Sequence, residues 1–166
     1  MSKMRAQRGV GMVEVLVALL LLAIGVLGFT ALQLRAVGAS IEASSQILAL
    51  NLARDLTERM RANPQAIQCK SYAVGKITQS TVAATCTNGA TAQAQATKDL
   101  QNAFTQANNQ GMVMVTDTCP AKASSRQCVY VAWDKTAASF GSKSDCYDSD
   151  NNTYKTGTTC LFLEAY

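Results

Sequence analysis

The feature that most constrains this chain is an apolar run near the N-terminus with a single acidic residue at its start. Residues 15–34 include no charged side chain, and Glu14 directly precedes them. A helix of about 20 residues rises roughly 30 Å, which matches the hydrocarbon core of a bilayer. The run therefore predicts a membrane-spanning helix. A carboxylate at its edge is unfavourable in lipid, so it requires a functional reason.

Three basic residues lie in the short segment before this run. Lys3, Arg5 and Arg8 belong to the 15 Lys and Arg residues of the chain, whose net charge is +4. Basic residues stay on the cytoplasmic side of a membrane helix, so we expect the C-terminal body to be exported. The remainder of the chain is nearly neutral and has no basic stripe. We therefore expect no nucleic-acid partner.

The cysteines all follow the apolar run: Cys69, Cys86, Cys119, Cys128, Cys146 and Cys160. An even number of cysteines on the exported side of a membrane favours disulfides. Zinc is the alternative, but zinc ligands usually come as closely spaced pairs, often with histidine, and the chain has no histidine. We expect disulfides, one of which can join Cys119 and Cys128, the pair closest in sequence. The spacing leaves the full connectivity open.

Helical periodicity continues beyond the apolar run. Apolar residues recur mostly at spacings of three or four residues, at Val37, Ile41, Leu48, Leu52, Leu56 and Met60. Pro64 is the first proline of the chain, and the residue before a proline avoids the helical region. We therefore expect one helix over residues 10–62, roughly 80 Å long.

The chain after Pro64 predicts a small α+β body. Residues 92–107 favour a short helix, whereas three segments favour strands, at residues 112–115, 128–133 and 159–163. The first two strands are expected to form an antiparallel hairpin. The predicted fold class is therefore α+β, with a long N-terminal helix packed on a small antiparallel sheet.

Gly9, Val10 and Glu14 mark the boundary between the basic segment and the apolar run. A protease that cuts at the cytoplasmic face needs a small residue before the bond, and glycine provides one. A cut after Gly9 leaves Val10 as the new N-terminus and retains the apolar helix, unlike removal of a secretory signal peptide. The alternative is an uncleaved anchor with Glu14 among the lipid headgroups.

The basic leader, Gly9, Glu14 and the run VLVALLLLAIGVLG resemble the N-terminal signal of type IV pilins. The following ALQLRA, the apolar stripe and LARDLTERMRANP are similar to PilV-like minor pilins. The resemblance is close over residues 8–64, and beyond them only the cysteine-rich, strand-rich layout fits. Two positions depart from the family pattern: Val10 replaces the usual phenylalanine or methionine, and Gly11 the usual threonine or serine.

This resemblance implies how the N-terminus is processed and used. Prepilin peptidase would cleave between Gly9 and Val10, and the Val10 amine would be methylated. In the family, the glutamate that matches Glu14 pairs with the N-terminal amine of a neighbouring subunit. Such a pair would offset the unfavourable placement of Glu14 in lipid and set the axial register of the assembly.

The resemblance also implies a division of the chain and a location. The expected parts are a removed leader (1–9), a transmembrane half-helix (10–34), an amphipathic half-helix (35–64) and a periplasmic or extracellular body (65–166). The chain would reside in the bacterial inner membrane and then in the pilus fibre, where it would prime assembly or modify the tip. Expected partners are other minor and major pilins, prepilin peptidase, the inner-membrane assembly platform and a tip adhesin.

Two alternatives remain at this point. A minor pseudopilin of a type II secretion system shares the same leader, although the six cysteines favour a pilus because pseudopilins typically have few. An uncleaved periplasmic binding or adhesion domain with a single membrane anchor would retain Met1.

Two patterns near the C-terminus are weaker candidate sites. Asp148, Asp150 and Asn152 have the oxygen spacing that begins a calcium loop, but the glycine and terminal glutamate of that motif are missing. A solvated loop beside Cys146 is the favoured interpretation. The aromatic side chains either form a partner surface or pack in the core and at a strand edge: Tyr147, Tyr154, Phe162 and Tyr166.

The sequence offers no pattern for catalysis. Without histidine, no Ser/His or Cys/His pair can form, and no phosphate-binding glycine loop is present. We therefore expect a non-enzymatic protein without a cofactor or a dedicated metal site.

Overall fold

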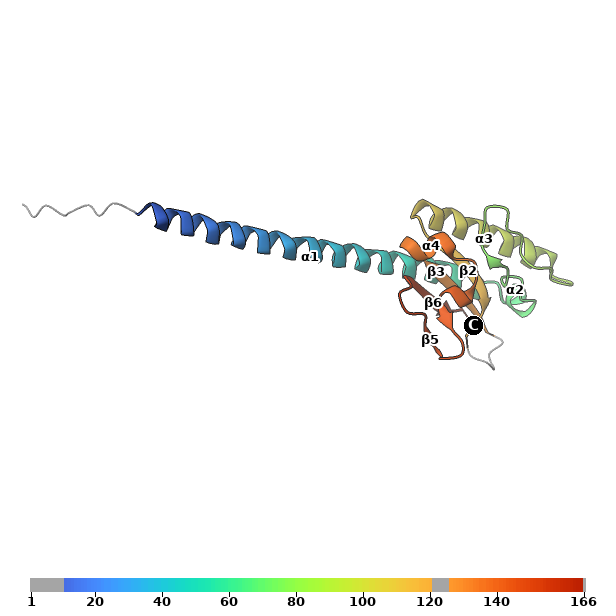
Figure 1. The fold of residues 1–166 in the computed structure, drawn as a ribbon. Coiled ribbons are helices and arrows are strands. Elements are labelled where there is room, and N and C mark those ends of the chain that lie inside the picture. The colour runs from blue at the N-terminus through green and yellow to red at the C-terminus, as the bar shows by residue number, and fades with distance from the viewer. Residues whose placement is uncertain (1–10, 121–125, 166) are drawn as a thin grey trace, which may run out of the picture. The chain divides into compact units, whose positions relative to one another are not determined.

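The computed structural model describes residues 11–120 and 126–165. The elements in chain order are α1 (Met12–Arg61), α2 (Pro64–Gln68), β1 (Gly75–Lys76), α3 (Ala90–Asn109), β2 (Val113–Thr118), β3 (Gln127–Ala132), α4 (Asp134–Ser139), the 3-10 helix η1 (Lys143–Asp145), β4 (Tyr147–Asp148), β5 (Thr153–Tyr154) and β6 (Cys160–Glu164) (Figure 1). The chain divides into two units, residues 1–43 and residues 44–166, and we call the second the head domain.

The long helix predicted over residues 10–62 is confirmed as α1. It ends where Asn63 precedes Pro64, as the sequence predicts. The side-chain oxygen of Asn63 accepts a hydrogen bond from the Ala66 backbone N–H at 3.4 Å, which caps the start of α2. Pro64 occupies the first position of α2, where a missing N–H has no consequence.

A four-stranded antiparallel sheet with the order β1-β2-β3-β6 forms the centre of the head domain. β2 and β3 form the predicted hairpin, with Val115 opposite Tyr130. On its other side β3 pairs with β6, so that Tyr130 lies opposite Phe162. All three predicted strand segments are therefore confirmed. β4 and β5 form a separate two-stranded hairpin in a region for which the sequence predicts only a loop.

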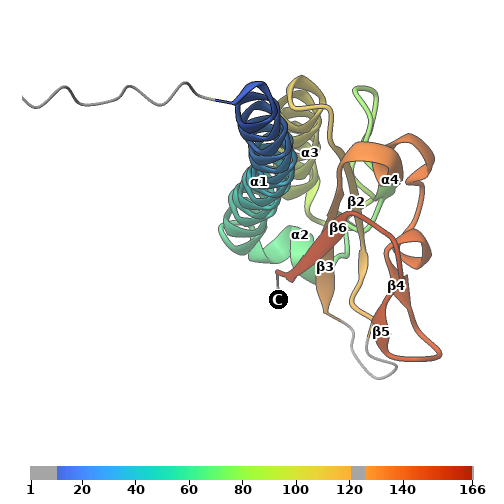
Figure 2. The same ribbon diagram turned by 60° about the vertical axis from the view of Figure 1, so that its left-hand side comes forward.

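The sheet has an apolar core on each face, which explains why all six residues of β3 are buried. Val129, Val131 and Trp133 belong to the core that includes residues of α1 and α3. Tyr130 belongs to the second core, with Phe140. Figure 2 shows α3 and the C-terminal part of α1 on one side of the sheet, and α4 with the β4–β5 hairpin on the other.

α3 confirms and extends the helix predicted over residues 92–107. Its buried face consists mainly of alanines together with Leu100 and Asp99. Small side chains let a helix approach its neighbours closely, so this face adds little volume to the core. The head domain therefore places a small-residue helix beside α1.

The head domain buries only the second half of the apolar stripe predicted along α1, as expected for a sheet packed on the C-terminal half of the helix. Leu56 and Met60 are fully buried, but Val37 and Ile41 are 57% and 63% exposed. The head domain begins at Ser44, and Val37 and Ile41 belong to the preceding unit. Helical spacing identifies an apolar face, but it does not tell which turns of that face a neighbouring element covers.

Candidate assembly helix and surfaces of the head domain

Glu14 lies in the first turn of α1 and is exposed. Its backbone N–H donates to the Gly11 carbonyl at 2.9 Å, so the residue is part of the helix from its first turn. No described residue forms an ion pair with the Glu14 carboxylate. The carboxylate is therefore available for a cation from another molecule. The predicted processing residues Gly9 and Val10 lie outside the described residues.

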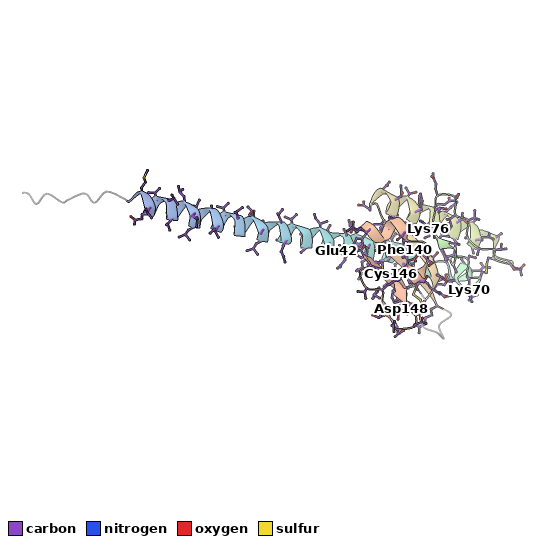
Figure 3. All side chains as sticks on the ribbon, viewed as in Figure 1. Glu42, Lys70, Lys76, Phe140, Cys146 and Asp148 are labelled. Atoms are coloured by element: carbon purple, nitrogen blue, oxygen red, sulfur yellow. A yellow bond between two sulfur atoms is a disulfide. The ribbon has the colours of Figure 1, made fainter. Side chains whose placement is uncertain are left out.

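The N-terminal part of α1 exposes apolar side chains on all sides. Every large apolar residue from Met12 to Ile41 is exposed, from 48% at Val15 to 91% at Met12. Figure 3 shows these side chains projecting around the helix. The helix is long and apolar enough to cross a membrane. Burying one such side chain contributes about 1.5–3 kcal/mol, so this surface favours contact with lipid or with other apolar helices.

A buried polar network joins α1 to α3. Asp99 on α3 is 2% exposed, and its carboxylate accepts hydrogen bonds from the Tyr72 hydroxyl at 2.7 Å and from the Gln95 side-chain amide at 3.0 Å. A guanidinium nitrogen of Arg59 on α1 lies 3.8 Å from the same carboxylate. Burial, with the hydrogen bond to Asp99, raises the pKa of Tyr72, because both favour the neutral phenol.

Three disulfides link the six cysteines in the order of the chain: Cys69–Cys86, Cys119–Cys128 and Cys146–Cys160. The expected disulfides are therefore present, and one of them joins the pair closest in sequence. A bridge that closes a loop of about 15 residues contributes roughly 3 kcal/mol by limiting the unfolded chain. These bridges therefore stabilise the head domain.

The candidate calcium residues lie at the turn between β4 and β5, near the labelled Asp148 in Figure 3. Asp148 accepts hydrogen bonds from the Asn151 side chain at 2.7 Å and from the Asp150 backbone N–H at 2.9 Å, which hold the pKa of Asp148 below its ordinary range. The amide oxygen of Asn152 accepts from the Tyr147 hydroxyl at 2.7 Å. These oxygens therefore serve the turn itself, and the described residues contain no cluster of three or more acidic, cysteine or histidine ligands.

The aromatic residues of the C-terminal region pack together. The Phe162 ring lies 5.4 Å from the Tyr130 and Tyr154 rings and 5.6 Å from the Tyr147 ring, measured between centroids. Tyr130 is fully buried, whereas Tyr154 is 46% exposed. The packing interpretation is therefore confirmed for Tyr147, Tyr154 and Phe162. Tyr166 lies outside the described residues.

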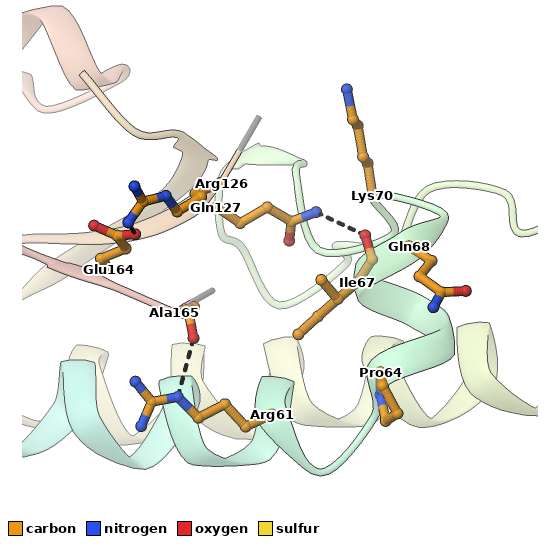
Figure 4. A pocket seen from close by; sticks show the side chains of 9 residues that line it. All are labelled: Arg61, Pro64, Ile67, Gln68, Lys70, Arg126, Gln127, Glu164 and Ala165. Carbon is orange, nitrogen blue, oxygen red and sulfur yellow. Dashed lines mark hydrogen bonds and ion pairs between the residues drawn. The ribbon is translucent and has the colours of Figure 1, made fainter. Parts of the chain in front are cut away.

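A pocket of about 1140 Å³ lies in the head domain, between the end of α1, α2, the start of β3 and the end of β6 (Figure 4). Arg61 donates from Nε to the Ala165 carbonyl at 3.0 Å across this pocket. Gln127 is 2% exposed, and its side-chain amide donates to the Ile67 carbonyl at 3.3 Å. The other end of that amide, Oε1, has no hydrogen-bond partner in the part of the chain that the structure describes.

Asp99 and Gln127 are buried polar residues that the sequence reasoning does not identify. Asp99 lies on the same face of α3 as the buried Ala92, Ala96 and Ala103. The spacing of Asp99 from these alanines, three, four and seven residues, is the sequence signal that would have predicted its burial. A buried carboxylate in turn requires polar partners. Gln127 carries no comparable signal, because it stands at the first position of its strand.

Two family models match the chain. The one described as prokaryotic N-terminal methylation motif matches residues 4–30, and the one described as type IV pilin Tt1218 matches residues 31–101. The two matches adjoin, and together they include Gly9, Glu14, α1 and the first half of α3. No curated protein and no solved structure matches the chain.

The family matches agree with the architecture. A long N-terminal apolar helix followed by an antiparallel sheet with three disulfides is a pilin-like α+β fold. Members of this family are structural subunits that assemble with other pilins. By its two adjoining family matches and its fold, the chain belongs to the type IV pilin family.

Proposed function

We propose that this chain is a minor pilin of a type IV pilus, of the PilV-like kind, which primes assembly or modifies the pilus tip. The observation that carries the proposal is the N-terminal part of α1, which exposes apolar side chains on every side and bears Glu14, whose carboxylate forms no ion pair with any residue in the described part of the chain. An apolar helix of this kind is stored in lipid and later packs against other helices. The disulfide-rich head domain supports a surface-exposed pilus rather than a periplasmic pseudopilus.

Processing follows from the same proposal. Prepilin peptidase cleaves between Gly9 and Val10, and the new Val10 amine is methylated. Residues 10–34 hold the chain in the inner membrane with the head domain in the periplasm, and assembly then moves the chain into the fibre. The assembly platform, other minor and major pilins and a tip adhesin are its partners.

Glu14 provides the recognition step in this mechanism. A carboxylate within the bilayer costs about 2.5–3.5 kcal/mol, which a cation in direct contact can offset. The amine of Val10 on a neighbouring subunit supplies that cation once the leader is removed. Because Glu14 lies at a fixed turn of α1, the pair sets the axial position of one subunit relative to the next.

Substitution of the carboxylate tests the proposal in cells that assemble pili. Glu14→Ala is compared with the control Glu58→Ala. Glu58 is an exposed acidic residue on the same helix, and its carboxylate lies 2.8 Å from a guanidinium nitrogen of Arg61. The amount of each variant in sheared filaments is measured by immunoblot against the amount in membranes. We expect Glu14→Ala to reduce incorporation about tenfold and Glu58→Ala to leave it unchanged, because exposed ion pairs contribute little.

Equal incorporation of Glu14→Ala and the unchanged chain would contradict this role of Glu14. Recovery of the unchanged chain only from the periplasm of secreting cells would instead favour the type II pseudopilin alternative. An unprocessed chain that never accompanies a filament would favour the anchored binding domain.

A further inference from the structure

Three buried polar side chains of the head domain have no hydrogen-bond partner in the part of the chain that the structure describes. The atoms are Ser71 Oγ, Thr116 Oγ1 and Gln127 Oε1, and the three residues are 0%, 1% and 2% exposed. Leaving a buried polar atom unpaired is strongly unfavourable, so native proteins pair nearly all of them, either with protein groups or with ordered water. Three such atoms in one small domain therefore indicate a further partner.

Thr116 and Gln127 lie on the same face of the sheet. Val129 belongs to the core shared with α1 and α3, and it lies directly opposite Thr116 in the β2–β3 pair. Gln127 precedes Val129 by two residues on β3, so its side chain points to this same face. Diagonal positions on adjacent strands are within reach of each other when one side chain is long, as that of glutamine is.

Ser71 belongs to the segment that leads from α2 to β1. At the start of this segment, the Gln127 side chain donates to the Ile67 carbonyl at 3.3 Å (Figure 4), and the Ser71 backbone N–H donates to the carbonyl one residue earlier at 2.8 Å. At its end, Gly75 lies opposite Thr116 in the β1–β2 pair. Ser71 is thus held between the attachment to Gln127 and the pairing with Thr116. The three unpartnered atoms gather at one corner of the core.

The glycine opposite Thr116 leaves room on this face. Directly opposite residues of an antiparallel pair point to the same side of the sheet. A Cβ atom built on Gly75 would meet no atom within 4 Å. A water molecule is held inside a protein where it has about this much room and two to four polar partners. Both conditions are met beside Thr116.

One water molecule satisfies all three atoms. Gln127 Oε1 can only accept, so it takes one hydrogen of the water, whereas each hydroxyl can both donate and accept. The water donates its second hydrogen to one hydroxyl and accepts the hydrogen of the other. A cation fits less well, because these three groups carry no charge to compensate it. The described residues also contain no cluster of three or more acidic, cysteine or histidine ligands.

We propose that Ser71, Thr116 and Gln127 together bind one long-lived internal water molecule. The water joins the segment after α2 to β2 and β3, so it is a structural part of the head domain. This inference is independent of the proposed function, because all of its residues belong to the head domain.

Removal of single hydroxyls tests the site in the full chain in detergent, by urea unfolding followed through the fluorescence of Trp133. Thr116→Val and Ser71→Ala each remove one hydrogen bond of the water. We expect each to lower the ratio of folded to unfolded chain about fivefold, as for the loss of one hydrogen bond. A hydroxyl without a partner would give the opposite result, because replacing it by an apolar group removes an unfavourable burial. An unchanged or higher ratio in either variant would overturn the inference.

The double variant shows whether the two hydroxyls share one partner. With a shared water, Ser71→Ala and Thr116→Val together should lower the ratio by less than the product of their single effects. The matched control combines Ser71→Ala with Thr136→Val, which changes a buried threonine of α4 on the other side of the sheet (Figure 2). The effects of this control pair should multiply. Multiplying effects of Ser71→Ala and Thr116→Val would overturn the shared site.

Oxygen-17 relaxation dispersion detects the water itself, because it counts the water molecules that stay in a protein for longer than the protein tumbles. The unchanged chain should hold one more such molecule than the double variant of Ser71 and Thr116. Equal numbers would overturn the inference and leave the proposed function as it stands.

Discussion

Replacing Tyr72 by phenylalanine tests whether the buried polar network around Asp99 stabilises the head domain. The change keeps the fully buried ring and removes only the hydroxyl that donates to Asp99 at 2.7 Å. A hydrogen bond to a charged group contributes about 1.5–3 kcal/mol. Asp99 keeps its contacts with Gln95 and Arg59, so we expect a loss at the lower end, about 1.5 kcal/mol.

Unfolding of the full chain in detergent by urea measures this loss. Trp133 is the single tryptophan and lies in the core at 5% exposure, so its fluorescence reports on the head domain. Tyr147→Phe is the matched control, because its hydroxyl bonds to Asn152 in an exposed turn. The unfolding midpoint should fall for Tyr72→Phe and stay within error for Tyr147→Phe. Equal midpoints for the two variants would refute the stabilising role of the network.

Two further predictions concern packing and pH. Gly89→Ala should lower the melting temperature by several degrees, because the added Cβ would collide with Sγ of Cys86. Gly141→Ala is the control and should leave the melting temperature unchanged, because the nearest atom to its added Cβ is 3.8 Å away. Equal melting temperatures for the two variants would contradict this prediction. Burial raises the pKa of Tyr72 and Tyr130 above the unfolded value near 10. The contribution of these two tyrosines to stability should therefore be complete below about pH 10 and fall as the pH rises further; urea midpoints at pH 8 and pH 11 that agree would contradict this.

The regular elements follow from the sequence because their signals are long or local. The end of α1 is predicted from Asn63 and Pro64, and the strand at β3 from the alternation of Val129, Val131 and Trp133. These patterns depend on backbone geometry that acts over a few residues. Short elements such as β1 and β4, with two residues each, contain no period to detect.

The contacts between distant elements are what the sequence leaves open. Several pairings of six cysteines are compatible with the spacing, and only the fold brings Cys146 to Cys160 at a Cα separation of 5.9 Å. Burial of Asp99 depends on Tyr72 arriving from another segment. The Asp148 carboxylate of the candidate calcium pattern likewise accepts hydrogen bonds within its own turn, between β4 and β5, which the sequence predicts only as a loop.

The central claim is that the apolar helix survives removal of the leader and passes from the membrane into the filament. The most direct measurement is the intact mass of the chain recovered from sheared filaments. The account predicts a chain that begins at Val10, carries one added methyl group and lacks six cysteine hydrogens. A chain that begins at Met1 and is found only in membranes would contradict the account.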